Sequence, residues 1–157
     1  MVKIENKQDC CGCTACSIVC GHKAIAMKAD AMGFLYPEVD LAKCVECGLC
    51  DKVCQFNKTL SRIEPSFKKF AFAARNVNNA EVATSRSGGV FIALSNYVLD
   101  SGGVVYGAGF DTPFKVAHKR ALSAKERDEF KGSKYTQSDV RDIFQQVKSD
   151  LKDGRYV

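Results

Sequence analysis

Residues 10–20 read CCGCTACSIVC, and residues 44–54 read CVECGLCDKVC. A shift of 34 residues places the first stretch on the second, and both then have the spacing C-x2-C-x2-C-x3-C. The matched cysteines are Cys10, Cys13, Cys16 and Cys20 in the first stretch and Cys44, Cys47, Cys50 and Cys54 in the second. Cys11 lies outside the repeat, because Val45 stands at the equivalent position. The two stretches decide the fold of this part of the chain, since together they contain all nine cysteines, eight of them in the repeat.

The repeated spacing predicts two [4Fe–4S] clusters. A cubane has four iron corners, and three cysteines two residues apart can hold one face of it. The fourth cysteine of each run begins a short helix and binds the other cluster. We therefore expect one cluster on Cys10, Cys13, Cys16 and Cys54, and the other on Cys44, Cys47, Cys50 and Cys20. Gly12, Ala15 and Gly48 suit loops whose backbone N–H groups approach inorganic sulfide.

Other cysteine chemistries fit the spacing less well. Zinc motifs usually come as separated C-x2-C pairs, and a two-iron or three-iron cluster does not need eight thiols in this symmetric arrangement. The N-terminus, MVKIENKQD, is polar and does not resemble a signal peptide, so we expect a cytoplasmic protein, where disulfides are rare. We interpret Cys11 as a bystander, with cluster repair or register swapping as the alternatives.

Residues 4–57 resemble a bacterial-type two-[4Fe–4S] ferredoxin domain. The resemblance includes AIAMKADAMGFLYPEVD at 24–40, which predicts a hairpin that turns near Gly33. The family usually has proline after the fourth cysteine of each run, whereas this chain has Gly21 and Gln55, a change that concerns shielding of the clusters rather than ligation. A region of about 60 residues buries little apolar surface, so we expect it to need its metal to fold.

The rest of the chain alternates between strand and helix patterns. Residues 58–68 are polar, contain Pro65 and predict a linker. Strands are expected at 69–75, 104–110 and 114–122. Helices are expected from Ser87 to Asp100, from Ser123 to Phe130 and over 139–152. The last helix should bury one apolar face, made of Val140, Ile143, Phe144, Val147 and Leu151.

This alternation predicts an α/β layered domain over 69–157, so the expected fold class is α+β: a two-cluster ferredoxin domain at 1–57, then an incomplete α/β domain. Residues 155–157 look like the start of another strand. We therefore expect this chain to be the front part of a longer protein, in which the last helix packs poorly or is covered by a partner chain.

ATSRSGGVFIALSNYVLDSGGVVYGAGFD and FKGSKYTQSDVRDIFQQVKSDLKDGRYV resemble the N-terminal module of the coenzyme F-420 hydrogenase/dehydrogenase beta-subunit family. Some members of this family carry an N-terminal two-cluster ferredoxin and occur in anaerobic bacteria. The resemblance implies a flavin, FAD or FMN, or a deazaflavin, in the full-length protein. The cofactor-binding candidates are Ser87, Gly88, Gly89, Lys134 and Tyr135. Plain helix caps are the alternative for SRSGG and GSKYTQS, and packing is the better interpretation of His22 and His118.

The basic net charge does not indicate nucleic acid. The value of +5 counts the cysteines as neutral; eight thiolates around two oxidised cores of about +2 each lower it to about +1. Basic runs interleaved with aromatics are missing, and tryptophan is absent, so we expect no nucleic-acid partner. No apolar run approaches the roughly 18 residues of a membrane span.

The leading hypothesis is the electron-transfer portion of a flavin-linked oxidoreductase, with no catalytic residue in this chain itself. Its partner would be a redox protein or a downstream domain. The second hypothesis is an electron carrier whose α/β region only docks a partner, and the third is a zinc-stabilised interaction module. Iron, zinc and flavin contents distinguish the three.

Overall fold

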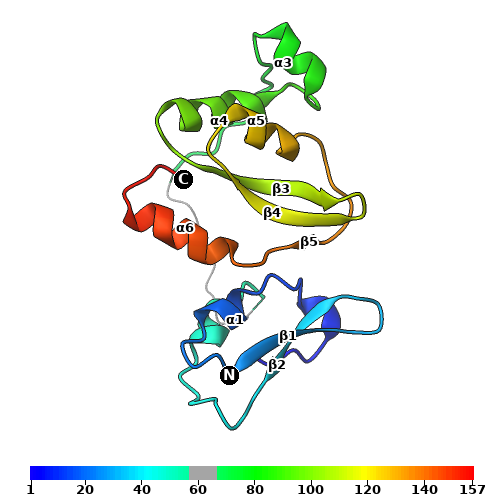
Figure 1. The fold of residues 1–157 in the computed structure, drawn as a ribbon, viewed down its shortest axis with the longest axis vertical. Coiled ribbons are helices and arrows are strands. Elements are labelled where there is room, and N and C mark those ends of the chain that lie inside the picture. Colours follow the sequence, from blue (N-terminus) through cyan, green and yellow to red (C-terminus); the bar gives the residue numbers. More distant parts are fainter. Residues whose placement is uncertain (57–66) are drawn as a thin grey trace. The chain divides into compact units, whose positions relative to one another are not determined.

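The structure is a computed structural model that describes residues 1–56 and 67–157. The chain divides into two compact units, which are called here the N-terminal unit, Met1–Lys68, and the C-terminal unit, Lys69–Val157. Both contain short helices and a small sheet, so the protein has a mixed α+β fold (Figure 1). Most of the linker expected at 58–68 lies outside the described residues. In the described ranges, no helix is long and apolar enough to cross a membrane.

The N-terminal unit is built around one β-hairpin. Strands β1, Ile25–Ala29, and β2, Leu35–Val39, pair antiparallel, with Met27 opposite Pro37. The turn between them is fixed by Asp30, whose Oδ1 accepts from the N–H of Met32 at 2.9 Å and of Phe34 at 3.1 Å. Gly33 adopts a φ of 86° in this turn, so the predicted hairpin and its turning point are confirmed.

The cysteine repeat is also a repeat of backbone conformation. Helix α1, Ala15–Val19, and helix α2, Leu49–Lys52, begin 34 residues apart and contact each other. Two left-handed residues precede each helix at the same offset: Gly12 and Thr14 before α1, and Glu46 and Gly48 before α2. The two runs therefore form the same loop followed by the same helical turn. The 3-10 turn η1, Lys7–Asp9, precedes the first loop.

The core of the N-terminal unit is small and includes sulfur. Its buried members are Val2, Ile25 and Cys50. The partly buried residues packed against them are Met1, Ile4, Cys16, Val19, Cys20 and Val39. Thiols thus occupy positions where a larger domain would place leucine or valine, which is consistent with a fold that depends on what the thiols bind.

The C-terminal unit has a three-stranded sheet in the order β3-β4-β5. Strands β3, Val105–Thr112, and β4, Lys115–Ala121, form an antiparallel hairpin. Strand β5, Ser138–Asp139, pairs parallel with β4. Helices α4, Val90–Asp100, and α5, Ala124–Arg127, lie on one side of the sheet, and α6, Ile143–Lys152, lies on the other (Figure 1). Helix α3, Asn79–Thr84, precedes α4, and the 3-10 turn η2, Asp128–Phe130, follows α5.

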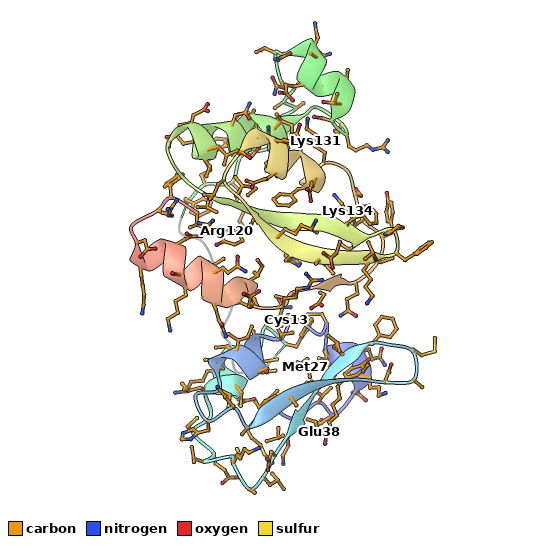
Figure 2. All side chains as sticks on the ribbon, viewed as in Figure 1. Cys13, Met27, Glu38, Arg120, Lys131 and Lys134 are labelled. Carbon is orange, nitrogen blue, oxygen red and sulfur yellow. The ribbon has the colours of Figure 1, made fainter. Side chains whose placement is uncertain are left out.

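Strand alternation explains this layering. On one face of the hairpin, Gly107 and Gly109 leave room for the ring of Phe130, and Ala117 and Ala121 are fully buried. On the other face, Arg120 reaches α6 (Figure 2). Ser123 caps α5 with the reciprocal hydrogen bonds of a capping box to Glu126, as the sequence predicted.

The strand predicted at 69–75 is wrong. The structure has no strand there, and Phe70 and Phe72 are 68% and 86% exposed. An apolar run forms a strand only where a ladder and a buried face are available. Directly after this segment, the N–H of Asn76 donates instead to the carbonyl of Gly88 at 2.7 Å, in the turn before α4.

The last helix begins later than predicted and buries only part of the predicted face: Ile143 is buried and Val147 is half-buried. Asp139 is used in β5 and Arg141 has a φ of 49°, so the helix starts at Ile143. Phe144 and Leu151 remain exposed at 42% and 58%, whereas Ile143 and Asp150 are buried. The helix is therefore rotated so that Asp150 faces the sheet. Beyond it, the carbonyl of Tyr156 accepts a hydrogen bond from the N–H of Val104 at 2.7 Å, beside the start of β3.

Candidate metal centre

The eight repeated cysteines line two separate cavities in the N-terminal unit. The first cysteine cavity is lined by Cys10, Cys13, Cys16 and Cys54, together with Cys11. The second cysteine cavity is lined by Cys44, Cys47, Cys50 and Cys20. Each has about 370 Å³ of space not filled by atoms, part of it open to solvent. The fourth cysteine of each run thus lies at the cavity of the other run.

The folding of each run explains this exchange. The first three cysteines of a run lie in or next to the loop with two left-handed residues, and the short helix carries the chain away before the fourth. The expectation that the fourth cysteine begins the helix is therefore wrong, because Cys20 and Cys54 follow α1 and α2. Because α1 and α2 contact each other, the end of each helix comes close to the loop of the other run. Figure 2 labels Cys13 in the first loop and Met27 on β1, both of which line the first cysteine cavity.

Backbone N–H groups point at several of the sulfur atoms. The N–H of Val2 donates to Sγ of Cys50 at 3.2 Å, and the N–H of Ala24 donates to Sγ of Cys20 at 3.3 Å. The second cysteine cavity therefore has sulfurs that already accept hydrogen bonds from two different segments. Donors of this kind stabilise negative charge on thiolates and on a metal cluster.

The pKa values of the thiols in the first cysteine cavity describe the metal-free site. Burial raises the pKa of Cys16 to about 11, opposed by the N–H of Ser17 and reinforced by Cys13 and Cys10. Burial also raises the pKa of Cys13, opposed by the N–H of Ala15 and reinforced by Cys11 and Cys10. Clustered thiols resist joint ionisation because each thiolate repels the next, and a bound cation removes this penalty.

The donor set fits an iron–sulfur cluster. Each cavity offers four sulfurs, and the remaining lining is largely apolar, with Val39 and Leu49 in one and Ile4 and Met27 in the other. Soft thiolates in such surroundings suit iron–sulfur clusters and zinc. In the described ranges, no group of three or more His, Cys, Asp or Glu side chains has the arrangement that holds a single metal ion.

Cys11 differs from the repeated cysteines in its contacts. It is exposed, it lies at the first cysteine cavity, and its Sγ accepts a hydrogen bond from Nε2 of Gln55 at 3.2 Å. Gln55 stands where the ferredoxin family has proline, and the structure gives its amide this contact. The interpretation of Cys11 as a bystander stays a prediction.

Thr14 is a residue of this site that sequence reasoning missed. It follows Cys13 directly, lines the first cysteine cavity and is 9% exposed. Its hydroxyl oxygen is buried and, within the part of the chain that the structure describes, has no hydrogen-bond partner. The only feature of the sequence that distinguishes this position is that threonine stands at 14 where the second run has Gly48.

The two segments proposed for a flavin meet at one cavity of the C-terminal unit. Its lining includes Ser85, Arg86 and Gly89 from the turn before α4, and Lys131, Gly132 and Ser133 from the loop after η2. The cavity has about 520 Å³ of space not filled by atoms, part of it open to solvent. Of the five predicted cofactor-binding residues, only Gly89 lines it. Ser87 and Gly88 are next to Gly89 in the chain.

Lys134 and Tyr135 differ from each other in their surroundings, and their role in binding a cofactor stays a prediction. The ammonium group of Lys134 donates to the carbonyls of Glu129, Lys131 and Gly132 at 2.9–3.1 Å, which uses its three protons. Burial also lowers its pKa. Lys134 thus stabilises its own loop, and Tyr135 is 95% exposed. Figure 2 labels both Lys134 and Lys131. The ammonium group of Lys131 lies 3.3 Å from Oε2 of Glu81.

The two histidines also have definite surroundings. Nδ1 of His118 lies 2.9 Å from Oγ of Ser138 and links β4 to β5, in agreement with a packing role. His22 is exposed and lies at the second cysteine cavity.

Comparison of the chain with models of protein families finds no match, and comparison with curated proteins finds none either. The function must therefore be argued from the cysteines and their surroundings.

Proposed function

We propose that the N-terminal unit binds two [4Fe–4S] clusters and transfers single electrons, as the electron-transfer portion of a flavin-linked oxidoreductase. The observation that carries this proposal is the sorting of the eight repeated cysteines into two cavities of four, with Cys54 and Cys20 exchanged between the runs. Reciprocal exchange is the ligand pattern of two-cluster ferredoxins with this spacing.

The chain's own residues hold and tune such clusters. Eight thiolates bind iron, and the N–H groups of Val2 and Ala24 stabilise negative charge on Cys50 and Cys20. Apolar side chains, among them Ile4 and Leu49, line the same cavities as the sulfurs. One-electron transfer is the chemistry that a bound cluster supplies, and the protein contributes position and electrostatics.

Paired alanine variants test the exchange of ligands. In Cys16→Ala/Cys54→Ala, both changes are in the first cysteine cavity, so about four of about eight irons should remain. In Cys16→Ala/Cys20→Ala, the changes are in one run but in different cavities, so both clusters should be lost. Iron analysis of anaerobically purified protein measures both. If the same-run pair keeps four irons and the same-cavity pair keeps none, the ligand assignment is rejected.

The flavin part of the proposal rests on the cavity lined by Arg86, Gly89 and Lys131. This cavity is partly open to solvent and has Arg86 in its lining, which suits an anionic group, whereas the ammonium group of Lys131 is paired with Glu81 and Asp128. Flavin analysis of the full-length protein tests it. Flavin bound at one per chain and weakened by Arg86→Gln supports this site. Binding unchanged in Arg86→Gln would place flavin elsewhere.

A second candidate is an electron carrier whose C-terminal unit docks a partner. The observation in its favour is the apolar exposed face of α4, where Phe91, Leu94 and Tyr97 are 42%, 64% and 66% exposed. Residues at such spacing line one side of a helix. Absence of flavin from the full-length protein, with both clusters present, would favour this candidate.

A further inference from the structure

The first cysteine cavity contains a hydroxyl group that the ligand set does not explain. Oγ1 of Thr14 is, among the described residues, the buried side-chain polar atom without a hydrogen-bond partner. A buried hydroxyl normally finds a partner, because leaving it unpaired costs free energy. Thr14 lines the cavity formed by Cys10, Cys13, Cys16 and Cys54, so its surroundings consist largely of sulfur and apolar groups.

The backbone makes Thr14 an unfavourable choice at this position. Its φ is 63° and its ψ is −3°, a left-handed conformation that is strained for a β-branched residue. The equivalent residue of the second run is Gly48, with nearly the same angles, 74° and 0°, and without that strain. The fold therefore accepts glycine at this point of the loop, and threonine adds strain, a methyl group and an unpaired hydroxyl. Strained residues of this kind cluster at functional sites.

We propose that the Thr14 hydroxyl donates a hydrogen bond to sulfur of the group bound in the first cysteine cavity and makes the two cysteine cavities electrostatically different. The proposal rests on the proposed function, since the acceptor is a thiolate or sulfide sulfur of a cluster. Thr14 acts as a tuning residue and is not a ligand. The second cysteine cavity lacks this donor because a glycine stands at 48.

The consequence is a difference in reduction potential. One electron from a reductant such as dithionite adds one negative charge to a cluster, and that charge is shared by the sulfurs. A hydrogen-bond donor stabilises the more negative, reduced state and shifts the potential towards less negative values. Removal of the hydroxyl should therefore make one of the two clusters harder to reduce and leave the other unchanged.

The experiment is a redox titration of the full chain, purified without oxygen and followed by electron paramagnetic resonance. Thr14→Val keeps the β-branched shape and removes the hydroxyl. At a fixed potential, it should lower the ratio of reduced to oxidised cluster about tenfold for one cluster, equal to about 59 mV for one electron. Thr14→Ser keeps the donor and should titrate like the wild type.

A reciprocal variant tests the same idea in the other cavity. A Cβ added to Gly48 meets no atom within 4 Å, and Gly48→Thr introduces at this position the same left-handed strain that Thr14 has in the wild type. It should shift the second cluster towards less negative potential. Thr14→Gly removes the hydroxyl together with the backbone strain, and it serves as the second test if Thr14→Val folds poorly.

The outcomes separate this proposal from the proposed function. Wild-type protein without iron would reject the clusters themselves. Wild-type iron content with unchanged midpoints in both Thr14→Val and Thr14→Gly would reject the role of Thr14 alone. Loss of iron in Thr14→Val and Thr14→Gly but not in Thr14→Ser would also overturn it, because the hydroxyl would then serve assembly and not the potential.

Discussion

Asp150 joins three elements of the C-terminal unit through one buried carboxylate. Its Oδ2 accepts from Nε of Arg120 at 2.7 Å and from the hydroxyl of Tyr106, and its Oδ1 accepts from NH2 of Arg120 at 2.6 Å. These contacts, led by Arg120, lower the pKa of Asp150 to about 2. The charged carboxylate thus links α6 to β3 and β4.

The pH dependence follows from the direction of this shift. The pKa of Asp150 is lower in the folded state than the value of about 3.9 for an unfolded aspartate. Its contribution to stability is therefore present above about pH 4 and is lost as the pH falls towards 2. Hydrogen exchange of β4 amides should show weaker protection in Asp150→Asn than in wild type at pH 5. The difference in protection between the two proteins should narrow as the pH falls from 5 to 2.5 and continue to narrow towards pH 2.

The matched control is Asp153→Asn, an exposed carboxylate just after α6. It should leave the exchange of β4 unchanged at both pH values. A gap between Asp150→Asn and wild type that stays constant from pH 5 to 2.5 would contradict the assigned role of the charged form.

Cys11 and Cys13 should differ in their contribution to iron binding. Cys13 belongs to the repeat, whereas Cys11 is exposed and is contacted by Gln55. Cys11→Ser should keep about eight irons per chain, and Cys13→Ser should lose about four. Iron analysis after anaerobic purification measures both, and loss of iron in Cys11→Ser would make Cys11 a ligand.

The spacing of the cysteines predicts them as cluster ligands, but no pattern in the sequence indicated a role for Thr14 or Asp150. The spacing of eight thiols is a strong signal because a cluster requires that geometry. Thr14 gives no such signal, since an unpaired hydroxyl is visible only when its surroundings are known. The burial of Asp150 could not be predicted for a similar reason. The apolar pattern predicts that Leu151 is buried, but the buried residue is Asp150, because Arg120 on β4 stabilises its carboxylate.

At the scale of elements, the packing of η2 on the β3–β4 hairpin depends on glycine. A Cβ added to Gly107 would lie 2.5 Å from the ring of Phe130, whereas one added to Gly109 would keep ordinary distances of 3.4 Å or more. Gly107→Ala should therefore lower the free energy of unfolding by about 1–3 kcal/mol through overpacking.

Gly109→Ala is the control, because it adds the same group to the same face of the same strand. It should change the free energy of unfolding by less than about 0.5 kcal/mol. The free energies of unfolding of the two variants are compared by urea unfolding, followed by the circular dichroism of the C-terminal unit. Equal effects of the two substitutions would show that Phe130 does not pack on Gly107 as described.

Elements with strong local signals were predictable, and elements defined by tertiary pairing were not. The capping box at Ser123 and the β1–β2 hairpin around Gly33 were both found from the sequence. Strand β5 has two residues and exists only because β4 lies beside it, so no pattern could indicate it. The same dependence explains why 69–75, apolar but exposed, is not a strand.

At the scale of the whole molecule, the two units should respond differently to loss of metal. The N-terminal unit has a core of three buried residues, one of which is Cys50. The C-terminal unit buries Ile92, Val104, Val116 and Phe130 without any cysteine. Removal of iron with a chelator under reducing conditions should unfold the first unit and leave the second folded.

Hydrogen exchange resolved along the full chain measures this. Amides of β1 and β2 should lose protection after chelation, and those of α4 and β4 should keep it. Equal protection of β1 and β2 in both states would mean that the N-terminal unit folds without metal.

The central claim is that eight cysteines, sorted into two cavities by exchange of the fourth cysteine of each run, bind two cubane clusters. The most direct measurement is iron, sulfide and zinc analysis of protein purified without oxygen, combined with electron paramagnetic resonance after reduction by dithionite. The account predicts brown protein with about eight irons and eight sulfides per chain and a paramagnetic signal from reduced clusters. Colourless protein that contains zinc, or no metal, and gives no signal after reduction would contradict it.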